Sequence, residues 1–302
     1  MTRRSVAFVL SLLLPAALWG GWRTAKPNAA IQHFLFFSAR RCSTAAQGCS
    51  LGAALGGIDA ANNAVAHHRA SGRVAVFWAG KTFRCTSSDG SEVADVLSAA
   101  AKAQQVSGIG VSYNDAQQSL ETLQTLAKQI RSPWILTNGT RRDGPNPWTS
   151  YADVPLVNGT TARVFAIAMG SHAVTNASLY LADPLVTLHQ ALAASPPGRV
   201  NVVLVSTDQR GLLAQIAAIP TVHVVFDGEE AAPEPYTADE TPEGALRLGV
   251  RGDGQALFRL SFRPSGPFGR WEYFRDSGTS LPGGTAIATR WSYMSAVELL
   301  TR

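Results

Sequence analysis

The chain has 302 residues, of which 46% are hydrophobic and only 16% are charged. This composition is typical of a globular protein with a large core and argues against a disordered chain. The net charge of +5 is spread along the sequence, and the densest basic sites are the doublets Arg40-Arg41 and Arg141-Arg142. Nucleic-acid-binding proteins usually cluster Lys and Arg on one face, so we expect no nucleic-acid partner.

The amino-terminal segment is typical of an export signal. Arg3 and Arg4 precede an uncharged apolar run over residues 5–19, which Pro15 interrupts. A run of this length is short for a spanning helix, so it predicts a signal peptide over residues 1–27 and a mature domain over residues 28–302. We expect a periplasmic or extracellular protein. It would be attached to a membrane only if this segment stays uncleaved as an anchor.

Strands and helices alternate through most of the mature chain. Short apolar runs rich in β-branched and aromatic residues predict strands, and amphipathic spacing predicts helices. The predicted strands are residues 31–38, 74–79, 108–111, 134–137, 162–169, 200–206 and 222–226. The predicted helices are residues 58–69, 91–105, 119–130, 184–194 and 210–218.

Three further segments complete the prediction. Residues 140–150 are rich in turn formers and predict a loop. Residues 227–244, rich in Glu, Pro and Ala, predict a solvated acidic loop. Residues 245–250 and 255–262 alternate around a Gly-Asp-Gly turn, which predicts an antiparallel hairpin. Repeated strand-helix units ending in hairpins indicate a layered α/β domain, whose ligands bind beyond the carboxyl ends of the strands.

The segments around these strand ends resemble one enzyme family. They include LGGI at residues 55–58, VFWAG at 76–80, LETLQTLAKQ at 120–129, VVLVS at 202–206 and VHVV at 222–225. In order and spacing they are similar to the calcineurin-like metallophosphoesterases, and most closely to the periplasmic 5′-nucleotidase branch. The resemblance extends over residues 31–263. It implies an α/β/β/α sandwich with mixed sheets and C-terminal hairpins.

Enzymes of this family hold two metals with ligands from D-x-H, G-D, G-N-H-E, a single His and G-H-x-H motifs. Paired cations activate a hydroxide and neutralise the phosphoryl group, and they need anionic or neutral lone-pair donors. At the first motif this chain has Ala39 and Arg41 in place of Asp and His. At the second, Lys81 replaces the bridging Asp. An ammonium group cannot bridge two cations.

The remaining three motifs are also altered. Asn114 and Asp115 lie where G-N-H-E is expected, and this motif alone keeps ligand character. Thr207 follows Ser206 where the resemblance implies a histidine. The last motif is replaced by the acidic residues Asp227, Glu229 and Glu230. We therefore expect no metal, no cofactor and no catalytic residue.

These changes predict a phosphoesterase-like domain that binds a ligand instead of hydrolysing it. Arg41 and Lys81 would attract a small anion, or an unknown protein partner would use the same surface. Alternatively, the three acidic residues Asp227, Glu229 and Glu230 neutralise the two cations in an internally paired, vestigial site. A second hypothesis is a residual hydrolase in which the Asn and the acidic side chains hold one hard cation.

The third hypothesis concerns the cysteines. Cys42, Cys49 and Cys85 follow the first two strands, so the fold would bring them to one rim. The nearby cations Arg41 and Lys81 would lower the pKa of a thiol and support redox chemistry. The simpler alternative, which we favour, is one stabilising disulfide and one buried thiol.

Overall fold

A computed structural model of the chain describes residues 31–39, 51–80, 82, 90–117, 120–157, 159, 161–170, 178–197, 199–228, 236–240, 245–250, 256–265, 270–275, 279–280 and 292–295. The predicted signal segment, residues 1–27, lies outside these ranges. Among the described helices, none is long and apolar enough to cross a membrane.

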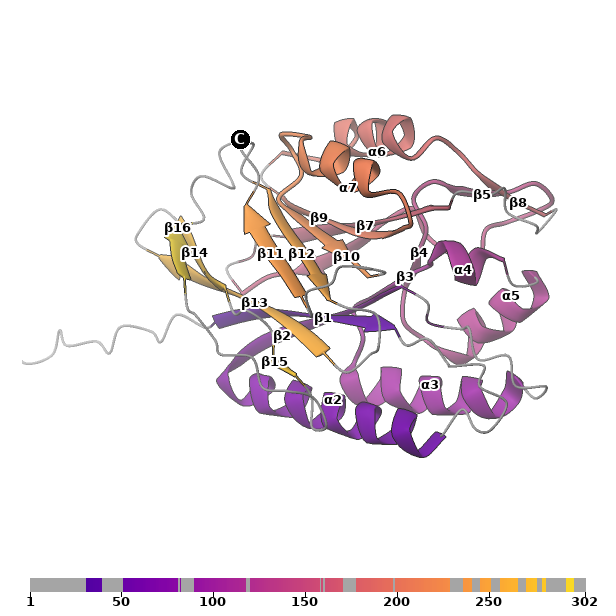
Figure 1. The fold of residues 1–302 in the computed structure, drawn as a ribbon, viewed down its shortest axis with the longest axis horizontal. Helices are drawn as coiled ribbons and strands as arrows, with labels where there is room; N and C mark the ends of the chain where they lie inside the picture. The colour runs from indigo at the N-terminus through magenta and orange to yellow at the C-terminus, as the bar shows by residue number, and fades with distance from the viewer. Residues whose placement is uncertain are drawn as a thin grey trace, which may run out of the picture.

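Two large sheets face each other in the centre of the molecule (Figure 1). Within the described ranges, the first has eight strands in the order β16-β14-β13-β1-β2-β3-β4, and β15 pairs with β13. Its strands are β1 (Ile31–Ala39), β2 (Gly72–Gly80), β3 (Gly108–Gly110), β4 (Trp134–Ile135), β13 (Ala256–Ser265), β14 (Arg270–Arg275), β15 (Thr279–Ser280) and β16 (Ser292–Ser295). The strands β1 to β4 are parallel, and β13 joins β1 in the antiparallel direction.

The second sheet has six described strands in the order β11-β12-β10-β9-β7-β6. They are β6 (Ala152–Pro155), β7 (Thr161–Met169), β9 (Val200–Thr207), β10 (Val224–Asp227), β11 (Tyr236–Glu240) and β12 (Leu246–Val250). The four inner strands are parallel, and β6 and β11 flank them as antiparallel edges. A small separate ladder joins β5 (Gly139–Arg141) to β8 (Leu179–Leu181).

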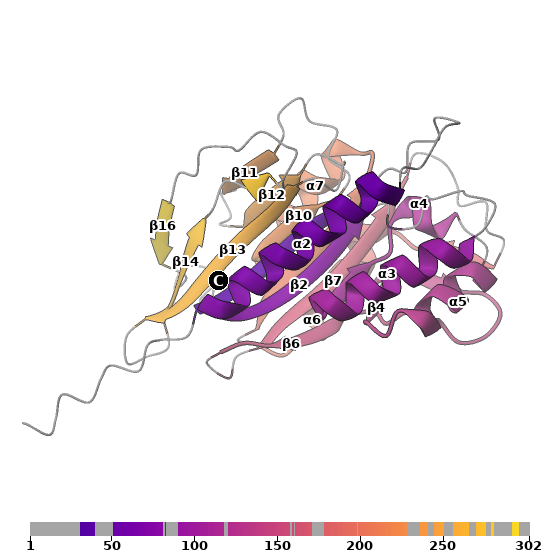
Figure 2. The ribbon, with the colours of Figure 1, turned by 90° about the horizontal axis from the view of Figure 1, so that it is seen from below.

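Helices cover the outer faces of both sheets. The helices α2 (Leu51–Ser71), α3 (Gly90–Gln104) and α5 (Leu120–Gln129) lie on the first sheet, as Figure 2 shows from below. The helices α6 (Pro184–Ala193) and α7 (Arg210–Ala217) lie on the second sheet, and the one-turn helix α4 (Tyr113–Ala116) follows β3. The four layers confirm the expected α/β/β/α sandwich.

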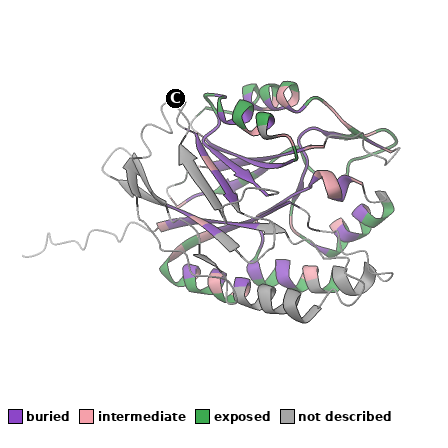
Figure 3. Cartoon of the chain, in the orientation of Figure 1, coloured by how far each residue is buried: buried purple, intermediate pink, exposed green. Residues whose placement is uncertain are grey.

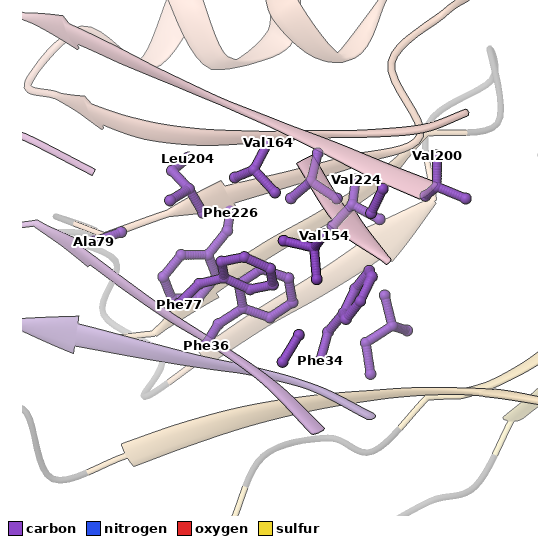
Figure 4. Packing of buried hydrophobic residues seen from close by; sticks show 14 of the residues in the cluster. Phe34, Phe36, Phe77, Ala79, Val154, Val164, Val200, Leu204, Val224 and Phe226 are labelled. Carbon is purple, nitrogen blue, oxygen red and sulfur yellow. The ribbon is translucent and has the colours of Figure 1, made fainter. Parts of the chain in front are cut away.

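Aromatic side chains fill the space between the sheets. Phe36 of β1 stacks on Phe77 of β2, with ring centroids 5.4 Å apart, and on Phe226 of β10 in the opposite sheet, at 4.9 Å (Figure 4). All three are fully buried. A second apolar cluster lies between the first sheet and its helices, and a third lies between the second sheet and its helices. Figure 3 accordingly shows buried strands and exposed outer faces of the helices.

Local capping explains where two helices begin. The Asp183 side chain accepts a hydrogen bond from Val186 N, and Pro184 occupies the first turn of α6. Ser112 and Asp115 form a capping box that starts α4. Such caps satisfy backbone N–H groups that have no partner within the helix.

The predicted hairpin over residues 245–262 is wrong. Its first strand, β12, lies in the second sheet between β10 and β11, whereas its second strand, β13, lies in the first sheet beside β1. The alternation of apolar residues is correct, but each strand buries its apolar side against a different partner. The C-terminal hairpin is instead formed by β13 and β14.

Other boundaries also differ from the expectation. Helix α2 begins at Leu51, seven residues before the predicted start, and it includes Gly56 and Gly57. The predicted acidic loop contains the edge strand β11, whose polar residues pair on one side only. The predicted loop over residues 140–150 includes the end of β5.

Candidate functional site

The carboxyl ends of strands from both sheets meet at one edge of the sandwich, which we call the carboxyl edge. Ala39, the last residue of β1, pairs with Gly80, the last residue of β2. Gly228 follows β10 in the second sheet, and its N–H donates to Val205 O of β9. A Cβ atom placed on Gly80 would lie 2.2 Å from Gly228 O. The two sheets therefore approach each other closely here at two residues that have no side chain.

A buried carboxylate joins two loops of the carboxyl edge. Asp115 is completely buried, and its Oδ2 accepts hydrogen bonds from Ser112 N at 3.1 Å and from Thr82 N at 3.3 Å. Its own N–H donates to Ser112 Oγ at 3.0 Å. Asp115 thus caps α4 and also holds the residues that follow β2.

The one-turn helix α4 also contacts the second sheet. Tyr113 N donates to the Ser206 Oγ of β9 at 3.0 Å, and Ser206 is buried. The Tyr113 ring lies against Gly170, where an added Cβ would come within 2.3 Å of the ring. The loop after β3 is therefore fixed to the ends of β9 and β7.

Two other polar side chains bind backbone near these strand ends. The Asn138 side chain donates to Ala168 O and Ala182 O, and its carbonyl accepts from Ala168 N. Thr207 Oγ1 accepts from Gln209 N at 3.0 Å before α7 begins. These groups hold the loops in place with neutral hydrogen bonds, and both side chains are buried.

The structure brings together several of the residues that the sequence singles out. Ala39, Thr207 and Asp227 end β1, β9 and β10, and the capping box places Asn114 and Asp115 directly after β3. Asp227 is buried, and Asn114 is partly exposed. The other predicted positions, which lie outside the described residues, are Arg41, Lys81, Glu229, Glu230, Cys42, Cys49 and Cys85.

The structure describes few metal donors at the carboxyl edge. Asp115 and Asp227 are its buried carboxylates in the described part of the chain, and Asp115 spends one oxygen on two backbone N–H groups. Among the described residues, no group of three or more His, Cys, Asp or Glu side chains could hold a metal ion. Two metals need several such ligands at once.

The described histidines lie away from this edge. His33 and His68 are buried beside each other near the start of β1, and His223 accepts a hydrogen bond from Asn201 N before β10. His67 and His189 are exposed on helices. They are surface histidines or hydrogen-bonded core histidines.

Sequence reasoning missed three residues that organise the edge. Thr82, Gly170 and Gly228 make contacts with segments far away in sequence. A glycine after a strand was the available signal for Gly228, because glycine permits close backbone approach. Nothing local distinguishes Thr82 from an ordinary loop residue.

The fold has clear counterparts among solved structures. The NAD nucleotidase of Haemophilus influenzae matches with a TM-score of 0.63 at 12% identity, covering 87% of this chain and 53% of that one. A 5′-nucleotidase precursor from Thermus thermophilus matches at 0.60 and 13% identity, covering 89% of this chain and 55% of that one. A calcineurin-like phosphoesterase from Bacillus subtilis matches at 0.56 and 11% identity, covering 86% of this chain and 93% of that one.

This chain spans about half the length of the two nucleotidases. No protein-family model matches the sequence. No curated protein matches it either. At 11–13% identity the structural matches establish the fold and not the activity. The chain therefore has the fold shared by the 5′-nucleotidases and the calcineurin-like phosphoesterases.

Proposed function

We propose that this chain is an exported, non-catalytic relative of the phosphoesterases that binds a small anion at its carboxyl edge without metal ions. Three residues define the proposed difference from a metalloenzyme. Lys81 and Arg41 replace ligands that the family resemblance implies, and Ala39 replaces a third. The proposed protein has a domain over residues 28–302 and a removable signal segment before it.

The use of Asp115 is the observation that carries this proposal. Its side chain is fully buried and accepts two backbone hydrogen bonds, from Ser112 and from Thr82. A carboxylate in this arrangement stabilises the loops that it joins, because Oδ2 accepts a hydrogen bond from each of them. The position thus supports a structural role for Asp115, within the one motif that keeps ligand character.

Fixed cations would replace the metals in attracting an anion. Lys81 lies in the sequence between Gly80 and Thr82, both of which the structure describes at the carboxyl edge. An ammonium and a guanidinium group can each bind phosphate or carboxylate oxygens through charge-assisted hydrogen bonds. They bind the ground state without generating a hydroxide nucleophile, so binding is expected without turnover.

Two assays on the mature chain test this proposal. The first measures hydrolysis of p-nitrophenyl phosphate and bis(p-nitrophenyl) phosphate with added Mn²⁺ or Zn²⁺, and we expect none above the buffer rate. The second measures the binding of inorganic phosphate and AMP by calorimetry in the presence of a chelator. Metal-dependent turnover, or a stoichiometric metal in the purified protein, would overturn the proposal.

A pair of matched variants locates the binding. Lys81→Ala should weaken anion binding about tenfold or more, because one charge-assisted contact contributes about 1.5–3 kcal/mol. Lys102→Ala changes the net charge by the same amount on the exposed last turn of α3. It should leave the affinity unchanged. Equal losses in the two variants would show a non-specific charge effect instead of a site.

A further inference from the structure

A cluster of basic side chains joins the end of α2 to the first sheet. His33 of β1 and His68 of α2 are 5% and 7% exposed, and their ring centroids are 5.4 Å apart. Arg259 of β13 lies on the same face of the sheet and its Nη1 is 3.3 Å from His68 Nδ1. His33 lies six residues before Ala39, so the cluster is about 20 Å from the carboxyl edge.

The hydrogen bonds define which protonation state fits. A guanidinium group only donates hydrogen bonds, so His68 Nδ1 must act as an acceptor and carry no proton. A doubly protonated His68 would direct an N–H group at the N–H of Arg259. The contact that joins α2 to β13 therefore exists only with a neutral imidazole.

His33 extends the same network through two hydroxyl groups. Its Nδ1 is 2.8 Å from Ser261 Oγ of β13, and its Nε2 is 3.2 Å from Ser71 Oγ at the end of α2. The Ser71 hydroxyl in turn donates to His68 O at 2.9 Å. One neutral histidine thus connects β1, β13 and the last turn of α2.

The titratable and charged groups that face the cluster are all basic among the described residues. They come from β1, α2 and β13, and they are His33, His67, His68, Arg69 and Arg259. Burial, followed by the charge of Arg259, lowers the pKa of His33 and of His68 from 6.5 to about 4. His67 is exposed, and Arg69 donates to Gln104 O on α3.

We propose that His33, His68 and Arg259 form an acid-sensitive latch, which fixes the carboxy-terminal turn of α2 to β1 and β13 at neutral pH and releases it in acid. Release would separate Val65 and Ala61 of α2 from the apolar cluster that contains Leu35 of β1. The latch is independent of anion binding at the carboxyl edge, because the two regions share no residue.

Hydrogen exchange of the mature chain at about pH 7 and about pH 4.5 tests the latch, after correction for the intrinsic exchange rate at each pH. We expect the amides of residues 61–71 to lose at least tenfold more protection than those of α6 over this interval. Equal losses in the two helices, or no loss in residues 61–71, would overturn the proposal.

Two variants separate the latch from general acid instability. His68→Gln keeps an acceptor for Arg259 but does not titrate, so the excess loss of protection in α2 should fall at least threefold. His189→Gln removes an exposed histidine from α6 and should behave like the natural sequence. If His68→Gln does not fold, an NMR titration of the natural protein decides, since the proposal requires both buried histidines to titrate below about pH 5.

Discussion

The backbone of Gly80, at the end of β2, lies directly against the backbone of Gly228, which follows β10. A Cβ atom on Gly80 would lie 2.2 Å from Gly228 O, and a Cβ atom on Gly228 would lie 2.5 Å from Gly80 N. The φ angle of Gly80 is +87°, in the region that favours glycine. The two sheets can approach this closely only because neither residue carries a side chain.

Gly80→Ala should therefore lower the free energy of unfolding by at least about 2 kcal/mol, since it adds a clash to an unfavourable φ angle. Gly159→Ala is the matched control, because Gly159 has a φ of +80° but no atom within 4 Å of the added Cβ. The control should cost only about 1 kcal/mol. Urea unfolding measures both, and equal costs would show that the contact with Gly228 contributes nothing.

Removing the Asp115 carboxylate should destabilise the protein. Asp115→Ala leaves the N–H groups of Ser112 and Thr82 without this acceptor in a buried place, at a cost of about 2–3 kcal/mol. Asp183→Ala removes an exposed cap of α6 and should cost about 1 kcal/mol. Thermal unfolding with and without a chelator should give the same ranking. A chelator that destabilises only the natural protein would indicate that Asp115 holds a metal.

The stability of the protein should fall between about pH 6.5 and pH 4. The folded-state pKa values of His33 and His68 lie below the unfolded value of 6.5, so the unfolded chain binds protons first as the pH falls. Each histidine should cost about 1–2 kcal/mol over this range, less than the full linkage value because water screens part of the charge. Between these pH values, the free energy of unfolding of His33→Gln should fall by about 1–2 kcal/mol less than that of the natural protein. An unchanged pH dependence would contradict the assignment.

A network of ion pairs fixes the β6 edge of the second sheet. Arg163 of β7 is buried, donates to both oxygens of Asp153 in β6, and stacks on Tyr151 with its guanidinium carbon 3.8 Å from the ring centroid. Hydrogen bonding to Arg163, followed by that to Arg199, holds the pKa of Asp153 below its usual value.

Asp153→Ala should consequently cost about 2 kcal/mol, because it leaves the buried Arg163 without its carboxylate. Arg199→Ala removes the more exposed partner and should cost less than about 1 kcal/mol. Urea midpoints at about pH 7 compare the two variants. A larger loss of stability in Arg199→Ala than in Asp153→Ala would show that the contact with Arg163 is not the important one.

Most of the fold follows from local patterns in the sequence. β1, β2, β7 and β9 are continuous apolar runs because parallel strands in this sandwich are covered on both faces. The strand β11 was not predicted, since a polar edge strand has the composition of a loop. The hairpin over residues 245–262 was wrong for a different reason. Local alternation shows that two strands exist, but it does not show that β12 and β13 enter different sheets.

The position of the candidate site was more predictable than its contacts. The carboxyl ends of parallel strands meet at one edge, so Ala39, Thr207 and Asp227 could be placed there from their order in the chain. The bond between Asp115 and Thr82 joins residues 33 positions apart, and no spacing rule predicts it. Long-range contacts of this kind depend on how the layers pack.

The pairing of β1 with β13 has a consequence for how the chain folds. Gln32 pairs with Phe262, so the first strand of the sandwich receives its second neighbour only from the far end of the sequence. Contacts of such large sequence separation slow folding, because the chain loses much entropy before they form. During synthesis one side of β1 stays open until about 230 more residues have been made. A chain shortened before β13 would keep that side exposed, and we would expect it to aggregate by edge-to-edge association.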